Sequence, residues 1–323
     1  MLAIRYTATG GPEVLETVEA PTPTPGPGQV LVRNEAIGLN FVDTYQRSGL
    51  YPVQLPATPG SEGAGEVEAV GDGVTRFRPG DKVAYGTGPM GAYGEYHLVP
   101  EDRLLKLPEG ISPRIAAAAM LKGMTCEMLV RRCYPLRAGE PALVWAAAGG
   151  VGSILTQWAR AIGAVVIGCV GSEEKVATAQ DHGCDHVILY KQEDVPARVR
   201  EITGGAGVRV SYDGVGRASF ESSLKSLGRR GMLVSFGNAS GPVPPVEPLA
   251  LSRGGSLFLT RPTLFDYVAT REELEQSAAA LFEVILSGQV KIEIGAEFPL
   301  RDARKAHEAI ESGATTGSIL LIP

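Results

Sequence analysis

Residues 142–162 read ALVWAAAGGVGSILTQWARAI, and they carry the strongest indication of how this chain folds. An apolar run leads into a glycine-rich turn, and a helical pattern follows and stops before Gly163. A strand, a glycine turn and a helix in this order form a dinucleotide-binding fingerprint. Gly149 lets the backbone approach a pyrophosphate, Gly152 lets the helix pack on the strand, and the helix N-terminus attracts negative charge. Ala147 stands at the first glycine of G-x-G-x-x-G, so a purely structural turn is the alternative.

Strands and helices continue to alternate through residues 124–262. Alternation at this length favours a doubly wound parallel sheet with helices on both faces. The expected strands are 142–147, 164–170, 186–190, 208–213, 232–236 and 256–260, and the expected helices are 153–162, 172–182 and 194–203, the second with Ser172 as its N-cap.

The two ends of the chain have a different pattern. Residues 1–123 contain many glycines, prolines and short alternating runs, which favour a β-rich domain with long surface loops. The last part predicts helices at 272–286 and 301–312 and a strand at 318–322. We therefore expect residues 1–123 and 263–323 to form one domain, into which the dinucleotide-binding domain 124–262 is inserted.

Composition limits the class of protein. The chain has 323 residues, which at roughly 150 per domain suggests two domains. A mean hydropathy near zero disfavours membrane and disordered proteins, and a net charge of −6 without a basic run disfavours nucleic acid as a main partner. We expect neither a membrane span nor a signal peptide. Four cysteines do not resemble a disulfide framework, so the cytoplasm is the expected compartment.

The end of the predicted strand 164–170 indicates which cofactor binds. An NAD-preferring site places Asp or Glu here to bind the ribose 2′-hydroxyl. This chain has Gly171 and Ser172, with Lys175 one turn later. The missing carboxylate leaves room for a 2′-phosphate, and Lys175 supplies a positive charge, so NADPH is favoured. The alternative is that Lys175 is an ordinary solvated lysine, and Glu173 and Glu174 weaken the positive field.

Motifs along nearly the whole chain resemble the quinone oxidoreductase and zeta-crystallin branch of the medium-chain dehydrogenase/reductase superfamily. The fold implied by this resemblance is a Rossmann domain inserted into a β-rich, GroES-like catalytic domain. The motifs are GGPEVL at 10–15, GLNFVDTY at 38–45, RSGLYP at 47–52, the Gly139–Arg160 region around the glycine turn, VSFGN at 234–238, TRP at 260–262 and GSILLIP at 317–323.

The superfamily that the chain resembles contains zinc alcohol dehydrogenases and zinc-free reductases, and the sequence distinguishes between the two. Zinc members have Cys-x-x-Asp where this chain has Asn40 and Asp43, and Gly-His-Glu where it has Gly60, Ser61 and Glu62. No cluster of four cysteines follows residue 81, so we expect no metal. A metal site at His182, Cys184 and His186 is the disfavoured alternative, because these residues lie on both sides of an expected helix end at Gly183. Without a Lewis acid, the acceptor is expected to be electrophilic itself, a quinone or a conjugated enone.

Two tyrosines are the candidate catalytic residues. Tyr45 and Tyr51 can pack against a planar acceptor and donate a hydrogen bond to it, the alternative being half-buried packing residues. Asp43 is a poor candidate for a general acid, because its negative charge would oppose the charge that develops. An Arg usual in such reductases at Gly313 is absent, which weakens the preference for NADPH. The cofactor-binding residues implied by the turn and the resemblance are Asn40, Phe41, Asp43, Tyr45, Thr125, Met128, Gly149, Gly150, Val151, Gly152, Gly171, Ser172, Lys175, Tyr190, Gly214, Phe236, Gly237, Asn238, Thr260, Arg261 and Pro262.

The function implied is NADPH-dependent reduction of quinones by direct hydride transfer, with neither zinc nor flavin. Two alternatives remain: an enone or alkenal reductase on the same scaffold, and a non-enzymatic role in binding AU-rich RNA or as a crystallin-like protein. Residues 256–260 are expected to form an exposed edge strand of the sheet. We therefore expect a homodimer, with Leu257 and Leu259 near the interface.

Overall fold

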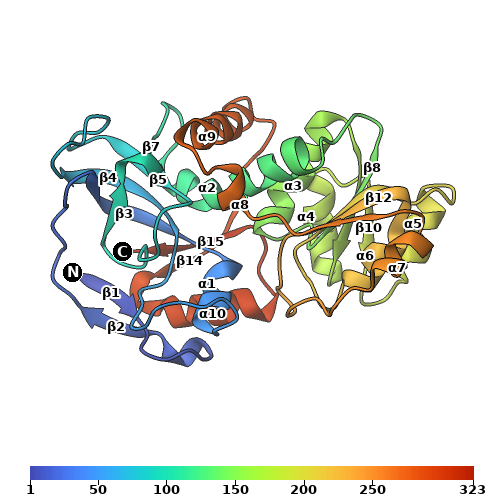
Figure 1. The fold of residues 1–323 in the computed structure, drawn as a ribbon, viewed down its shortest axis with the longest axis horizontal. Helices are drawn as coiled ribbons and strands as arrows, with labels where there is room; N and C mark the ends of the chain where they lie inside the picture. Colours follow the sequence, from blue (N-terminus) through green and yellow to red (C-terminus); the bar gives the residue numbers. More distant parts are fainter. The chain divides into compact units, whose positions relative to one another are not determined.

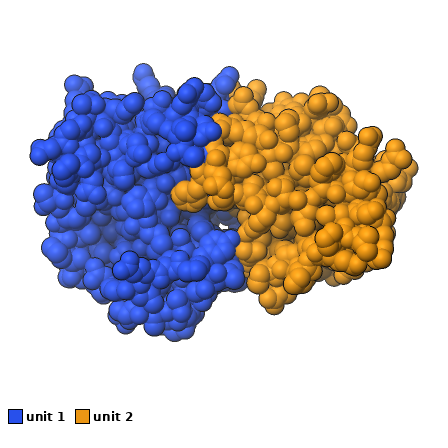
Figure 2. Space-filling model, viewed as in Figure 1, with its two compact units in different colours: residues 1–124, 268–286, 292–323 blue, residues 125–267, 287–291 orange.

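The computed structural model describes residues 1–323, which divide into two compact units (Figure 2). Unit 1 contains residues 1–124, 268–286 and 292–323, and unit 2 contains residues 125–267 and 287–291. Residues 263–267 and 287–291, expected with the β-rich part, thus lie in unit 2. Hydrogen bonds explain this: Arg132 donates to the Tyr267 carbonyl at 2.9 Å, and the Lys291 backbone N–H donates to Gln157 at 2.8 Å. No helix is long and apolar enough to span a bilayer.

Unit 2 is built on a six-stranded parallel sheet with the strand order β10-β9-β8-β11-β12-β13. Helices cover both faces of this sheet (Figure 1), which confirms the predicted doubly wound fold. The strand order reverses beside β8, where such sheets bind ligands at the carboxyl ends of the strands. The strands are β8 (Pro141–Trp145), β9 (Val165–Val170), β10 (His186–Leu189), β11 (Val208–Asp213), β12 (Leu227–Ser235) and β13 (Phe258–Thr260), and the helices are α3 (Gly150–Ile162), α4 (Val176–Asp181), α5 (Val195–Ile202), α6 (Phe220–Ser226), α7 (Pro248–Arg253) and α8 (Leu264–Tyr267).

One predicted helix of unit 2 differs in the structure. Residues 172–182 were expected to be a single helix, but a 3₁₀ turn at Glu173–Lys175 precedes a short α4. Ser172 begins this turn in extended conformation, and its side chain makes no capping hydrogen bond to the backbone there. The turn places Lys175 immediately before the helix and close to the end of β9.

Unit 1 contains a seven-stranded sheet in which the long strand β3 pairs with three neighbours. Its order is β14-β15-β3-β4-β5-β7, and β6 also pairs with β3. Strand β15 pairs antiparallel with β3 and parallel with β14, so segments from the first and the last part of the chain share one sheet. The strands are β3 (Gln29–Leu39), β4 (Glu62–Val70), β5 (Lys82–Tyr85), β6 (Tyr96–Pro100), β7 (Leu105–Lys106), β14 (Ile294–Pro299) and β15 (Ser318–Ile322), with a separate hairpin of β1 (Leu2–Arg5) and β2 (Glu16–Glu19).

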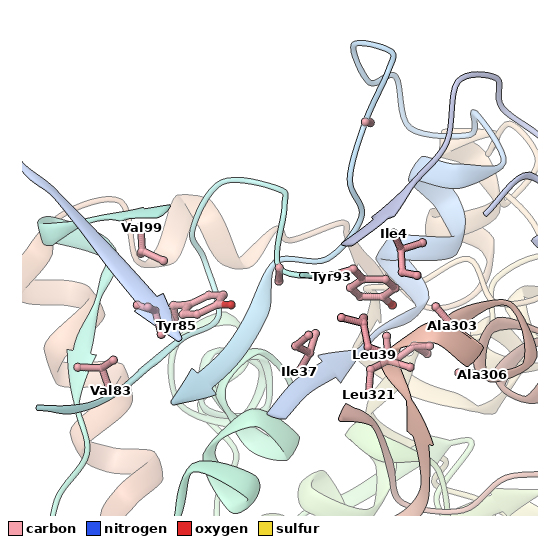
Figure 3. Packing of buried hydrophobic residues seen from close by; sticks show 14 of the residues in the cluster. Ile4, Ile37, Leu39, Val83, Tyr85, Tyr93, Val99, Ala303, Ala306 and Leu321 are labelled. Carbon is pink, nitrogen blue, oxygen red and sulfur yellow. The ribbon is translucent and has the colours of Figure 1, made fainter. Parts of the chain in front are cut away.

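Four helices complete unit 1, and they include α1, which carries several predicted site residues. The core of this unit contains Ile4, Leu39, Tyr93 and Ala306, which Figure 3 labels within one packed cluster. Tyr93 is thus a polar-tipped side chain inside an apolar core. The helices are α1 (Phe41–Arg47), α2 (Pro113–Glu127, its last residues in unit 2), α9 (Arg271–Leu286) and α10 (Ala303–Ser312).

Candidate functional site

The glycine turn of unit 2 connects β8 to α3 through a very close backbone approach. A Cβ atom on Gly152 would lie 2.1 Å from the Ala146 carbonyl oxygen, so only glycine fits there. Gly149 is the N-cap of α3, and its N–H donates to the same carbonyl at 2.9 Å. The first N–H groups of a helix have no acceptor within the helix. Here Gly150, Val151 and Gly152 provide those groups at a helix end that attracts phosphate.

Gly171, at the carboxyl end of β9, lies against Tyr190. A Cβ on Gly171 would be 2.8 Å from the Tyr190 hydroxyl, and the ring of Tyr190 lies 5.6 Å from that of Trp145. Trp145, Tyr190 and Val215 border a cavity of about 420 Å³, which α5 and α6 also line. The place where a specificity carboxylate would stand is therefore occupied by an aromatic side chain.

Two lysines lie near this position. Burial lowers the pKa of Lys175, and the nearby Lys191 ammonium lowers it further, while Glu174 raises it. The effect of Lys191 shows that the two ammonium groups repel each other. Sequence reasoning missed Lys191, although its position directly after β10 and Tyr190 was the available signal.

The predicted residues after β11 and β12 lie together. A Cβ on Gly237 would lie 2.3 Å from the Gly214 carbonyl oxygen, and one on Gly214 would lie 2.9 Å from the Phe236 ring. Asp213 orders this loop, since its buried carboxylate accepts hydrogen bonds from two backbone N–H groups and from the hydroxyls of Ser219 and Ser223. The remaining predicted residues of unit 2 lie in the following places. Asn238 follows Gly237, Thr260 ends β13, Arg261 donates to the Ser235 carbonyl, and Pro262 follows Arg261. Thr125 lies in the last turn of α2, and Met128 is buried in the π-helical turn Met128–Cys133.

In unit 1, the predicted residues gather around α1. Asn40 is its N-cap and forms a capping box with Asp43. Tyr45 is buried and Tyr51 is partly buried; their ring centroids are 5.3 Å apart in an edge-to-face arrangement. Phe41 lies 6.2 Å from Tyr45. The two candidate tyrosines therefore form a single aromatic pair, held by the hydrogen bond from the Tyr51 N–H to the Tyr45 carbonyl at 3.0 Å.

Asp43 ends a buried chain of hydrogen bonds that crosses the core. Arg47 donates to His307 Nδ1 at 3.0 Å, and His307 Nε2 lies 3.1 Å from the Tyr93 hydroxyl, which donates to Asp43 at 3.1 Å. Because Arg has only donors, His307 must accept at Nδ1 and carry its proton on Nε2. Burial raises the pKa of Asp43 to about 7 and lowers that of His307 to about 3. Sequence reasoning missed Tyr93, Arg47 and His307.

A second buried cluster joins Glu62, Lys122 and Asn40. One oxygen of Glu62, Oε2, accepts from the Lys122 ammonium at 2.9 Å and from the Asn40 amide at 2.8 Å. The other oxygen accepts from the Leu121 N–H at 2.7 Å. A Cβ on Gly38 would lie 2.1 Å from Glu62 Oε2, so β3 needs glycine to accommodate the carboxylate. Sequence reasoning identified Asn40 as a site residue, named Glu62 only within the segment that lacks a zinc-ligating His, and missed Lys122.

This cluster does not fit a zinc ion. Zinc in proteins binds thiolate, imidazole and carboxylate ligands. The chain offers the amide of Asn40 and the hydroxyl of Ser61, and the Glu62 carboxylate is already bound to an ammonium group that would repel a cation. No three His, Cys, Asp or Glu side chains of the chain are grouped as a metal site, those at 182–186 included.

Known proteins match the chain along its whole length. Residues 26–109 match the family described as "Alcohol dehydrogenase GroES-like domain", and residues 150–283 match "Zinc-binding dehydrogenase". "Quinone oxidoreductase" of Pseudomonas aeruginosa is 53% identical over 321 residues, 99% of each chain. The crystal structures of quinone oxidoreductase from Pseudomonas syringae pv. tomato DC3000 superimpose with a TM-score of 0.98 at 51% identity, covering 100% of this chain and 99% of that chain.

A further match describes a bound cofactor. The structure of Escherichia coli quinone oxidoreductase complexed with NADPH has a TM-score of 0.98 and 48% identity, and all of both chains is covered. Identity at this level over the full length shows common family membership, which the glycine turn and the two-unit architecture also support. This chain therefore belongs to the quinone oxidoreductase family of the medium-chain dehydrogenase/reductase superfamily.

Proposed function

We propose that this chain reduces quinones with NADPH by direct hydride transfer, with neither zinc nor flavin. The observation that carries the proposal is the glycine turn before α3, in a chain that matches quinone oxidoreductases from end to end. NADPH, when bound, supplies a hydride; the quinone takes that hydride and one proton from water and becomes a hydroquinone. The substrate is thus a small molecule.

The residues of unit 2 supply a place for each part of the cofactor. The N-terminus of α3 binds the pyrophosphate through the N–H groups of Gly150, Val151 and Gly152. Lys175 and Lys191 bind the 2′-phosphate, since a dianion relieves the repulsion between their ammonium groups. Tyr190 flanks the adenosine, next to the cavity described above.

The residues of unit 1 act on the acceptor. The Tyr45–Tyr51 pair packs against the planar quinone ring, and a tyrosine hydroxyl donates a hydrogen bond to a quinone oxygen. Asn40 and Asp43 set the start of α1 and thereby the position of this pair. The remaining predicted cofactor residues, at the carboxyl ends of β11, β12 and β13, are proposed to line the nicotinamide through backbone groups.

One assay tests the proposed function. NADPH oxidation by the purified chain is followed with p-quinones, alkenals, simple ketones and, with NADP⁺, ethanol. We expect turnover with quinones and none with ethanol or ketones. Turnover of alkenals alone would replace the proposal with the enone reductase, and rapid ethanol oxidation would overturn both.

We also propose that two copies of the chain pair through β13. This strand is at the edge of the sheet of unit 2, and it carries Phe258 with 55% of its surface exposed. An exposed edge strand offers unpaired backbone groups to an identical strand. The structure changes one detail, because Leu257, expected near the interface, is buried in the core of unit 2. Phe258, together with Leu259, is the better interface candidate.

We propose the cytoplasm as the compartment. All four cysteines are free thiols, and Cys126, Cys169 and Cys184 are buried. Free cysteines persist most readily in a reducing compartment.

A further inference from the structure

Lys122 is a buried cation that the proposed function has not used. Its side chain keeps 6% of its surface exposed, whereas that of Glu62 keeps none. A lysine ammonium has three N–H donors, and Glu62 is the only acceptor that the structure gives Lys122. Two donors of a nearly buried ammonium are therefore left for a ligand. The small exposed part belongs to the lysine side chain and not to the carboxylate, so a ligand would reach the lysine before Glu62.

Stability alone does not explain the ion pair. Removing two charges from water costs several kcal/mol per ion, and a well-packed apolar pair of similar volume is often as stable. Yet the fold makes room for this pair. A Cβ atom at Gly38 would overlap Glu62 Oε2 and the Ala117 carbonyl oxygen, so this position of β3 needs a residue without a Cβ. The Glu62 carboxylate also has its hydrogen bonds satisfied by Leu121, Asn40 and Lys122. The cluster is therefore built, and Glu62 fixes the position of the ammonium.

The cluster is bonded to the start of α1, the helix that carries one of the tyrosines proposed to bind the acceptor. Asn40 and Lys122 bind the same oxygen of Glu62, and Asn40 is the N-cap of the helix that carries Tyr45. The family resemblance places zinc ligands of alcohol dehydrogenases at Asn40 and Ser61. Lys122 thus provides a fixed positive charge within a cluster that is unsuited to a metal ion.

We propose that Lys122 is a catalytic residue of the quinone reduction, whose free N–H donors stabilise the negative charge on the acceptor oxygen. This inference rests on the proposed function. The hydride brings two electrons to the quinone, and the resulting hydroquinone monoanion carries its charge on one oxygen. Lys122 hydrogen-bonds that oxygen and keeps its own proton, while water supplies the proton that completes the hydroquinone. Glu62 is the positioning residue of Lys122.

The test compares a charge-free pair with the natural one. The double variant Lys122→Met/Glu62→Gln removes both charges without leaving a buried carboxylate unpaired, which Lys122→Met alone would do. We expect its kcat with a p-quinone to fall about 100-fold, as on loss of one oxyanion donor, with the Kd of NADPH unchanged. Lys106→Met, a change of an exposed lysine in β7, is the matched control and should keep wild-type kcat. Thermal unfolding checks that all variants fold.

A binding measurement separates this inference from the proposed function. 4-Nitrophenolate, an anion that resembles the hydroquinone monoanion, should bind the double variant about tenfold more weakly than wild type, the effect of one charged hydrogen bond. Its neutral ether, 4-nitroanisole, should bind both equally. If wild type reduces no quinone, the proposed function fails, but the affinity for 4-nitrophenolate still tests whether Lys122 binds an anionic oxygen. Unchanged phenolate affinity, or an unchanged kcat in the double variant, would overturn the role of Lys122.

Discussion

At the level of single residues, Lys175 and Lys191 are the proposed binding residues of the 2′-phosphate. A charge-assisted hydrogen bond contributes about 1.5–3 kcal/mol, and exposure moves the value toward the lower end. We expect Lys175→Ala to weaken NADPH binding about tenfold and to leave NADH nearly unchanged. Lys191→Ala should act in the same direction but less, because Lys191 is exposed. Fluorescence titration of each variant with both cofactors measures this.

Equal losses for NADPH and NADH would show that these lysines do not bind the 2′-phosphate. The structure also bears on the opposite experiment, a substitution at Gly171 that would shift the cofactor preference toward NADH. Gly171→Asp would supply the carboxylate of an NAD-preferring site, but any side chain there meets the hydroxyl and ring of Tyr190. That variant therefore needs Tyr190 to move, and its effect on cofactor choice would mix charge with displacement.

Tyr51 tests the role of the aromatic pair. The substitution Tyr51→Phe keeps the edge-to-face packing against Tyr45 and removes only the hydroxyl. If that hydroxyl stabilises charge in the transition state, kcat falls by about tenfold or more, and the Kd of NADPH stays the same. Steady-state kinetics with a p-quinone, alongside cofactor titration, measures the two effects. An unchanged kcat would make Tyr51 a packing residue.

Gly152 and Gly149 form a matched pair within the same turn. A Cβ on Gly152 would overlap the Ala146 carbonyl oxygen at 2.1 Å, whereas one on Gly149 would lie 3.2 Å from it. We expect Gly152→Ala to destabilise the protein by about 1–3 kcal/mol, the usual cost of overpacking, and Gly149→Ala to cost clearly less. Urea unfolding compares the two. Equal losses would contradict the contact that we assign to Gly152.

At the level of elements, the link between α1 and α10 through His307 makes stability depend on pH. Burial lowers the pKa of His307 from 6.5 to about 3, with Arg47 adding to the effect. Between these pH values the unfolded chain binds a proton that the folded protein does not, so the free energy of unfolding rises with pH. The contribution is complete above about pH 6.5 and is lost as the pH falls. His307→Gln should reduce the acid loss, as measured by urea unfolding from pH 4 to 8.

The titration of Asp43 changes stability in the opposite direction to that of His307, so Asp43 serves as the control. Its pKa is raised by burial from 3.8 to about 7, so the folded protein keeps a proton that the unfolded chain releases, and stability falls as the pH rises through this window. Asp43→Asn removes that opposing contribution and should make the acid loss of stability steeper. His97, whose pKa burial lowers to about 4, leaves some acid sensitivity in every variant. Identical pH slopes in all three proteins would refute the assignment.

The elements differ in how far the sequence predicts them. The strands at 208–213 and 318–322 match β11 and β15 because apolar runs bounded by glycine or polar residues are local signals. The sequence does not predict the helix α2, because its run of alanines has no clear apolar face and follows a β-rich pattern. The Lys122–Glu62 pair joins residues 60 positions apart, and the Arg47–His307 contact joins residues 260 apart. No local pattern reports such contacts, whereas the glycine turn is contained within a few residues.

At the level of the whole molecule, the edge strand β13 is the proposed surface through which two copies of the chain pair. Phe258→Glu places a charge on the exposed apolar side chain, and burying that charge in an interface is costly. We expect wild type to be a dimer at micromolar concentration and Phe258→Glu to be a monomer in sedimentation equilibrium. Phe265→Glu, on the exposed part of α8, is the matched control and should stay dimeric. A monomeric wild type would rule out the proposed pairing.

Because β15 pairs with β3, the sheet of unit 1 cannot be completed before β15 has been translated. The sheet of unit 2 has all its strands once Thr260 has emerged, but residues Ile37–Leu39 of β3 wait for Leu321, Leu320 and Ile319, which are translated after every strand of unit 2. At roughly 5–20 residues per second, that open stretch persists for many seconds. Unit 1 therefore closes its sheet after unit 2 has all its strands, and during that time the nascent chain exposes an unpaired apolar edge that chaperones would have to shield.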